Sequence, residues 1–483
     1  MPRMLLSFFI FVNIAAIGQC EEVLTNIPQP KVDERAELLG IVFRLAGNPE
    51  YQCHAFKEYD DAINQHFAPF RRHPVIRAAQ SLRSKYGVSY DAVMSYAVHI
   101  SIENGRVALP NENSPDETSE KTLIELDSRW NRVEAQAQSF AMLLDDFYVV
   151  SRFHEFFEAH SEMYRKTEGK IKAITDNIDY LWFKKFFGEA DITRFRIVPS
   201  CVSEQGNYGT RCYFKDGSAE YYAIVCTRGP DAVYQENSYI PLIIHEFSHS
   251  FCNPHVKKYL DELRPSVERV WSFIEDQMAM QAYGSPDTLL YEYLVRACEI
   301  RYLFALGNEV EAYRSMARNR NNGFLWIEEL VKLLDQYENE RDRYPTLGDL
   351  MPEIVKMQNA IVTDGYIAKL HDRSPKIIAM NPPNGAKDVE LNFAEISLTF
   401  DRPMGGGMMW FTRNNTHAEP YPNHDSAVWS EDRLKCTGAN VGPLEPGTTY
   451  HIWFNYRGLY GFRCANGIPL KPVHYTFTTK EQE

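Results

Sequence analysis

Apolar residues recur along the chain with two different periods, and the change of period divides the sequence into regions. From residue 32 to about residue 188 they lie three or four residues apart, which is typical of helices with one buried face. Asp33 can cap the first helix, and further helices are expected over 73–86, 89–100, 117–149 and 151–187. The same spacing returns later in the chain, where helices are expected over 263–283, 286–306, 308–318, 323–340 and 347–360.

Three segments between these helical regions alternate apolar and polar residues and are expected to form strands. They cover 193–199, 210–215 and 219–227, and Lys215-Asp-Gly-Ser218 supplies a turn that joins the last two as a hairpin. The next regular element is expected to be a helix, because no proline and no charge other than Glu246 interrupts residues 242–251.

This expected helix carries the pattern His245-Glu-Phe-Ser-His249. Residues four apart lie on one face of a helix, so both imidazole rings can reach a single Zn²⁺ at about 2.0–2.1 Å. Glu246 is then placed to take a proton from a water molecule that the metal activates. The pattern is typical of zinc peptidases. A near match at 154–158 lacks the second histidine and is interpreted as an ordinary amphipathic helix.

A catalytic zinc normally has three protein ligands, and three residues are candidates for the third. His255 follows the motif at the spacing of a third histidine, while Glu292 and Glu299 lie seven residues apart on one face of a later helix. Arg296, four residues after Glu292, can pair with a carboxylate or with a substrate terminus. Asn253 can accept a hydrogen bond from a ligand ring.

The order of strand, hairpin and motif helix resembles that of the zincin peptidases, in which an edge strand pairs with an extended substrate; residues 219–227 are the candidate for that strand. The stretches 32–46, 244–254 and 292–297 are also similar to an uncharacterised family of exported bacterial proteins that carry this histidine pattern. That resemblance covers residues 30–370. It implies that the N-terminal helices belong to the catalytic unit, and it favours Glu292 with Arg296, in the gluzincin arrangement, as the functional pair.

After residue 374 the sequence changes to short alternating strands separated by proline and glycine turns, which predicts a β-sandwich. Pro382-Pro-Asn-Gly-Ala-Lys-Asp-Val389, Thr399-Phe-Asp-Arg-Pro-Met404 and Leu444-Glu-Pro-Gly-Thr-Thr-Tyr450 carry a resemblance to the bacterial Ig-like domain over 374–480. The resemblance implies a spacer or adhesion module without catalytic groups.

The N-terminus indicates export. Arg3 is followed by an apolar run and small residues, so residues 1–18 are expected to be a signal peptide that is cleaved before Gln19. A competing hypothesis is a lipoprotein modified at Cys20. The net charge of −14, without a basic cluster, argues against nucleic acid as a partner, and no later segment is long and uncharged enough to span a membrane.

Export permits disulfides, and the chain has nine cysteines. Cys201 with Cys212 or Cys226, and Cys436 with Cys464, are candidate local bridges; free buried thiols are the alternative. No CxxC spacing suggests a metal cluster.

The sequence therefore predicts an α+β protein: a mainly helical zincin-like domain with a small sheet, followed by an all-β Ig-like sandwich. The leading hypothesis is an exported zinc metallopeptidase of the periplasm, the cell surface or the medium, acting on proteins or peptides, with His245, His249 and Glu292 as ligands and Glu246 and Arg296 as catalytic candidates. The Ig-like domain would contact the cell surface. Alternatives are a surface binding protein with an inactive zincin-like domain and a zinc hydrolase of a non-peptide amide such as a cell-wall crosslink.

Overall fold

A computed structural model gives the arrangement of most of the chain. It describes residues 28–110, 120–123, 126–132, 134–188, 194–203, 206–411, 420–456, 461–465 and 468–481. The expected signal peptide and Cys20 lie outside the described residues. No described helix is long and apolar enough to cross a membrane.

The N-terminal third is helical and surrounds one apolar core. Its first helix, α1 (Glu34–Leu45), starts as expected at Asp33, whose side chain accepts a hydrogen bond from the Arg35 amide. The other α-helices are α2 (Lys57–Phe67), α3 (Pro74–Tyr86), α4 (Asp91–His99), α5 (Ser128–Asn131), α6 (Glu134–Val150), α7 (Phe153–Ala159), α8 (Ser161–Thr175) and α9 (Tyr180–Phe187). The near match at 154–158 lies in α7, as an ordinary helix. A short hairpin of β1 (Ser101–Glu103) and β2 (Arg106–Ala108) was not predicted from the sequence.

A three-stranded sheet separates this core from a second one. Its strands are β3 (Phe195–Ser200), β4 (Tyr208–Tyr213) and β5 (Ala219–Cys226), in the order β3-β5-β4. Successive side chains of a strand point to opposite faces. Accordingly Tyr222 and Ile224 of β5 enter the N-terminal core, while Ala223 and Val225 enter the core around the motif helix. The sheet therefore joins the two helical regions into one packed unit.

The expected hairpin is confirmed, but the expected edge strand is wrong. Strand β5 is the central strand: it pairs in parallel with β3 on one side and antiparallel with β4 on the other. Since both of its edges are used inside the sheet, residues 219–226 cannot add a peptide strand. The edge strand next to the motif helix is β4, and at its C-terminal end Tyr213 already accepts a hydrogen bond from the Thr122 amide.

The second core consists of helices that pack around the motif helix, α10 (Glu236–Lys258). This helix continues through Pro241 and Pro254, so Pro254 does not turn the chain after the motif. The following helices are α11 (Leu260–Ala279), α12 (Pro286–Ala305), α13 (Glu309–Asn321), α14 (Ile327–Asn339) and α15 (Leu347–Ile361). All of them were expected from the spacing of apolar residues.

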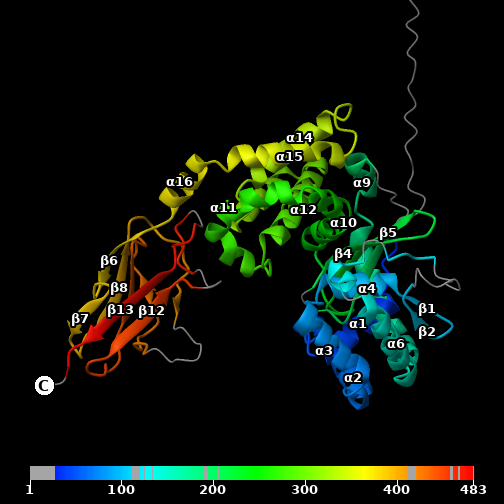
Figure 1. The fold of residues 1–483 in the computed structure, drawn as a ribbon, viewed down its shortest axis with the longest axis horizontal. Coiled ribbons are helices and arrows are strands. Elements are labelled where there is room, and N and C mark those ends of the chain that lie inside the picture. The colour runs from blue at the N-terminus through cyan, green and yellow to red at the C-terminus, as the bar shows by residue number, and fades with distance from the viewer. Residues whose placement is uncertain are drawn as a thin grey trace, which may run out of the picture.

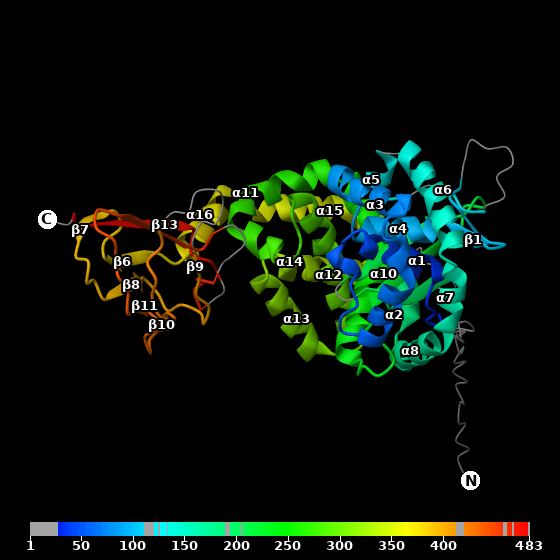
Figure 2. The same ribbon diagram turned by 90° about the horizontal axis from the view of Figure 1, so that it is seen from below.

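Helix α16 (Asp364–Arg373) leads into the C-terminal sandwich, which lies at the opposite end of the molecule from the N-terminal helices (Figures 1 and 2). One sheet has the order β10-β11-β8-β6 and the other β7-β13-β12-β9, with a separate core between them. The strands are β6 (Ile377–Asn381), β7 (Ala386–Val389), β8 (Glu395–Phe400), β9 (Trp410–Phe411), β10 (Val428–Trp429), β11 (Lys435–Ala439), β12 (Thr449–Phe454) and β13 (Val473–Thr479). The predicted sandwich is confirmed.

The structure shows neither of the candidate local disulfides. No bond joins the sulfur atoms of the eight cysteines from Cys53 to Cys464, and seven of these cysteines are buried. The Cys201 sulfur accepts a hydrogen bond from the Thr227 hydroxyl, and the Cys436 sulfur contacts the thioether of Met408. Apolar packing, rather than cross-strand bridging, accounts for these buried cysteines.

Candidate metal site

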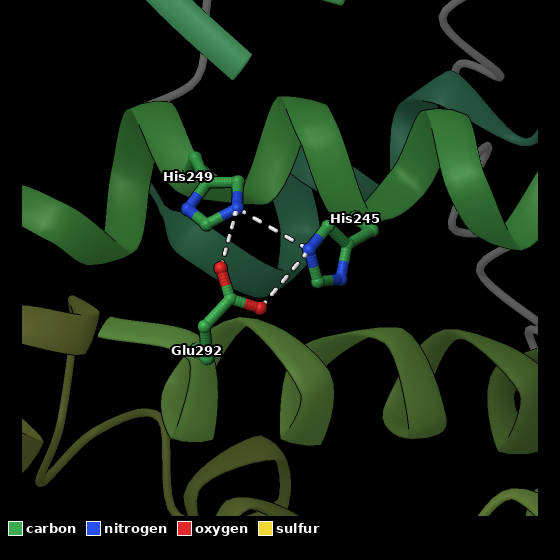
Figure 3. A group of neighbouring side chains, drawn as sticks. All are labelled: His245, His249 and Glu292. Atoms are coloured by element: carbon green, nitrogen blue, oxygen red, sulfur yellow. Dashed lines mark hydrogen bonds and ion pairs between the residues drawn. The ribbon is translucent and has the colours of Figure 1, made fainter. Parts of the chain in front are cut away.

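Two helices bring the candidate ligands together. His245 and His249 lie one turn apart on the face of α10 that meets α12, and Glu292 of α12 points between them (Figure 3). On another side of α10, Phe247 and Phe251 stack on Phe195 and Phe187, with ring centroids 4.4 and 4.5 Å apart. This apolar packing fixes the rotation of α10 and so directs both histidines toward α12.

The three side chains form a triangle in which facing nitrogen and oxygen atoms lie close together, and both oxygens of Glu292 take part. His245 Nε2 lies 3.2 Å from His249 Nε2 and 3.4 Å from Glu292 Oε2, and His249 Nε2 lies 3.5 Å from Glu292 Oε1. In a tetrahedral zinc site with bonds of about 2.0–2.1 Å, neighbouring ligand atoms are about 3.3–3.4 Å apart. The three distances, which involve both oxygens of Glu292, are close to this value, and a tetrahedral site would leave a fourth position for another ligand.

Each histidine has an oxygen acceptor at its outer nitrogen. His249 Nδ1 lies 3.2 Å from Asn253 Oδ1, as expected for that residue, and His245 Nδ1 lies 3.4 Å from Glu299 Oε2. When both Nδ1 atoms carry the proton and donate to these oxygens, both Nε2 atoms present lone pairs to each other. Two lone pairs at 3.2 Å repel each other. A cation between the rings would accept both lone pairs and remove this repulsion.

Glu292 is held by two further side chains. The Tyr283 hydroxyl donates to Glu292 Oε2 at 2.8 Å, and Arg296 Nε lies 3.5 Å from the same oxygen. Arg296 also donates to the Tyr283 hydroxyl at 2.7 Å and to Asn319 Oδ1 at 3.1 Å, and its guanidinium lies 4.7 Å from the Phe324 ring centroid. These contacts fix the carboxylate in an orientation that faces both histidines.

The electrostatics of the triangle favour a positive ion. Burial alone would raise the pKa of Glu292, but His245, His249 and Arg296 hold that pKa well below its ordinary value, so the carboxylate is ionised. Burial disfavours a charge on His245 as well, yet Glu292 and Glu299 outweigh it and raise its pKa. Burial and the neighbouring His245 lower the pKa of His249.

Glu246 lies in the same helix and is almost completely buried, with 5% of its surface exposed. Burial raises the pKa of Glu246 to about 7, although the charge of His245 opposes the shift. A carboxylate with a pKa in this range can both accept and return a proton near neutral pH. A dication in the triangle would lower this pKa.

The edge strand β4 rests directly on the motif helix. The Ser250 hydroxyl of α10 donates to the Thr210 carbonyl at 3.2 Å, and Arg211 donates to the Ser250 carbonyl at 2.9 Å. At Gly209, a Cβ atom would lie 1.9 Å from the Glu246 carbonyl oxygen and 2.9 Å from His249 Cβ. The glycine therefore permits a close approach of strand and helix beside the site.

The structure gives the positions of the sequence-predicted candidates relative to one another. It brings together His245, His249 and Glu292, the three residues whose ligand atoms lie within 4.8 Å of one another. Glu299 lies at the outer nitrogen of His245, and this group does not include it. The His255 ring lies beside Gly348 at the start of α15, and the metal-ligand group does not include it.

Arg296 is placed on Glu292, as its spacing predicted, and no described hydrogen bond or ion pair joins its side chain to Glu246. Tyr283 and Asn319, which complete the surroundings of Glu292, were missed. Tyr283 precedes α12 and Asn319 lies in α13, so no local spacing in the sequence connects either of them with the motif.

The chain is thus a two-domain protein with a candidate metal site in its helical domain and an Ig-like sandwich at its C-terminal end. Comparison with family models matches residues 31–357 to a domain of unknown function, DUF4932, and residues 371–479 to a bacterial Ig-like domain. The chain belongs to the DUF4932 family, and the expected order of the two domains is confirmed.

A search of the curated proteins found no match. The solved structures that were matched include surface-layer protein SbsC, domains 1–6, with 16% identity over 52% of this chain and a TM-score of 0.17, and S-layer protein rSbsC(31-844), with 12% identity over 85% and a TM-score of 0.17. The chain spans 34% and 46% of the lengths of these two proteins. Scores this low carry no argument about fold or function.

Proposed function

We propose that the chain is an exported zinc-dependent metallopeptidase with a zincin-like, gluzincin-type site. The observation that carries the proposal is the triangle of side chains His245, His249 and Glu292, whose facing nitrogen and oxygen atoms lie 3.2–3.5 Å apart. Its donor set of two imidazoles and one carboxylate is that of known catalytic zinc sites with one open position. The proposed reaction is hydrolysis of an amide bond, and the proposed substrates are proteins or peptides.

A Zn²⁺ ion held by these residues would supply a Lewis acid that polarises a carbonyl group and makes a water molecule more acidic. The chain's own residues carry out the proton transfers. Glu246 accepts a proton from the attacking water and then donates it to the leaving amine. Glu299 and Asn253 keep the proton of each ligand histidine on Nδ1, and Tyr283 with Arg296 holds Glu292 in its orientation.

The Ig-like sandwich has its own core and is joined to the helical domain through α16. We assign it the role of a spacer or anchor that contacts the cell surface. None of the three metal-ligand residues comes from it. A chain without residues 374–483 should therefore keep its metal.

The test is to purify the chain without its signal peptide, measure zinc by elemental analysis, and compare the cleavage of a mixed peptide library by the wild type and by Glu246→Gln. The expected result is one zinc per chain in both proteins and cleavage by the wild type alone. A matched control, Glu311→Gln, changes a half-buried carboxylate of α13 that pairs with Arg318, outside the metal-ligand group, and should leave both readouts unchanged.

Each other outcome has a separate meaning. Wild-type protein without stoichiometric zinc would refute the metal site and the hydrolase together. Zinc without peptide cleavage would refute the peptidase and favour hydrolysis of a non-peptide amide, or a binding role for an inactive domain. Equal cleavage by Glu246→Gln would exclude Glu246 as the general base.

A further inference from the structure

Two buried thiols meet between the helices that carry the candidate ligands. Cys252 of α10 and Cys298 of α12 are both fully buried, and their sulfur atoms lie 3.7 Å apart. Cys252 follows His249 by three residues, and Cys298 precedes Glu299 by one. At 3.7 Å the sulfur atoms are in van der Waals contact, and no other atom fits between them.

We infer that Cys252 and Cys298 form a disulfide that joins α10 to α12. A disulfide has a sulfur–sulfur distance of about 2.05 Å, so the two sulfurs must approach by about 1.6–1.7 Å. Rotation about the Cα–Cβ bonds moves the sulfur atoms, and the two helices already pack together in the second core. The inference does not depend on the proposed zinc chemistry. It requires that the chain is exported to an oxidising compartment, which the N-terminal signal predicts.

The chemistry balances by thiol–disulfide exchange. The Cys252 and Cys298 thiols lose two protons and two electrons, and one sulfur–sulfur bond forms. The electron acceptor is a disulfide, either of a thiol–disulfide oxidoreductase or of a low-molecular-weight thiol, and it is reduced to two thiols. Because both cysteines are buried in the folded chain, the exchange takes place while the exported chain folds.

Two of the other thiols have different surroundings. The Cys53 sulfur accepts a hydrogen bond from Arg44 at 3.4 Å, and the Cys436 sulfur lies 3.4 Å from the Met408 sulfur. A disulfide between Cys252 and Cys298 would enclose α11 in a covalent loop, with the two cysteines 46 positions apart. It would also fix the spacing of α10 and α12, and hence the spacing of the histidines from Glu292.

The test is a peptide map of the full chain, exported under its own N-terminal sequence from a bacterial host. The protein is denatured, its free thiols are blocked with N-ethylmaleimide, and it is digested without reduction for mass spectrometry. The expected product is a cross-linked pair of peptides that contains Cys252 and Cys298 and is two hydrogens lighter than the sum of its parts. Finding both cysteines labelled with N-ethylmaleimide in the exported protein would overturn the inference.

Thermal unfolding gives a second measurement. Reduction with a phosphine, which does not compete strongly for zinc, should lower the Tm of the wild type by roughly 5–15 °C, because it opens the covalent loop. Cys252→Ala/Cys298→Ala should unfold at the same temperature with and without the reductant, whereas the control Cys436→Ala should keep the wild-type shift. An unchanged shift in the double variant would also overturn the inference. Zinc content measured on the same samples separates this result from the proposed function.

Discussion

The contact between β4 and the motif helix can be tested at one position, Gly209. In Gly209→Ala the new methyl group would lie 1.9 Å from the Glu246 carbonyl oxygen and 2.9 Å from His249 Cβ. Ordinary contact begins at 3.4 Å, so strand and helix must separate by 3.4 − 1.9, or about 1.5 Å. The atom in the way belongs to the backbone, and no flexible side chain can move aside instead.

The expected cost follows from this overlap. Overpacking of a buried contact typically lowers the free energy of unfolding by about 1–3 kcal/mol. A matched control is Gly169→Ala, in which the glycine lies exposed in α8 with no atom within 4 Å of its added Cβ. Since alanine favours a helix more than glycine does, this control should stabilise the protein by up to about 1 kcal/mol.

Urea unfolding and a zinc affinity measurement together show which element moves. Displacement of α10 would disturb His249, and catalytic geometry tolerates only about 0.5 Å. Displacement of β4 alone would lower stability but leave zinc affinity intact. If Gly209→Ala unfolds at the same urea concentration as Gly169→Ala, the close approach of strand and helix is refuted.

Four more substitutions test the site and the core. Glu292→Gln should abolish stoichiometric zinc because it removes an ionised ligand, whereas Glu299→Gln, which acts only through His245 Nδ1, should weaken zinc binding roughly 10–100-fold in a chelator competition. Tyr283→Phe removes the hydroxyl that donates to Glu292 and should weaken zinc binding by a similar factor, without loss of fold. Burial raises the pKa of Glu37 to about 7, above its value of 4.5 in the unfolded chain, so the free energy of unfolding should fall by about 3 kcal/mol as the pH rises through this interval. Glu37→Gln should remove that part of the pH dependence, as measured by urea unfolding at pH 5 and pH 8.

A specific outcome would contradict each of these predictions. Equal zinc loss in Glu299→Gln and Glu292→Gln would mean that both carboxylates bind the metal. Wild-type zinc affinity in Tyr283→Phe would mean that Arg296 alone suffices to orient the ligand carboxylate. An unchanged pH dependence in Glu37→Gln would place the buried proton on another group of the N-terminal core.

The local elements of the site could be predicted because their signals are local. The spacing of His245 and His249 predicts a shared helix face, and the charge-free flanks predict a buried helix; α10 has both properties. The hairpin of β4 and β5 follows from alternating residues around a turn, and the structure has it. The Ig-like domain likewise has a local signal, namely short alternating strands separated by proline and glycine turns.

The parts that sequence reasoning could not determine depend on contacts between distant elements. Glu292 and Glu299 share a face of α12, so spacing alone cannot decide which of them meets Nε2 and which meets Nδ1 of His245. The contacts of the two carboxylates depend on the offset between α12 and α10 along their axes, which is set by tertiary packing. The order of the strands was also open, because a hairpin looks the same in sequence whether its second strand lies at the edge or in the centre of a sheet.

The N-terminal helices contribute to the site although no ligand comes from them. Val198, Tyr222 and Ile224 project from one face of the sheet into the N-terminal core, and Ala223 and Val225 project from the other face toward the motif helix. Removal of the N-terminal helices would expose the first face to water, and exposure of apolar surface costs about 25 cal/mol per Å². A loosened sheet would in turn release Gly209 of β4 from α10, and α10 would lose its support behind His249. The metal-binding unit therefore has to include the helices that begin at α1.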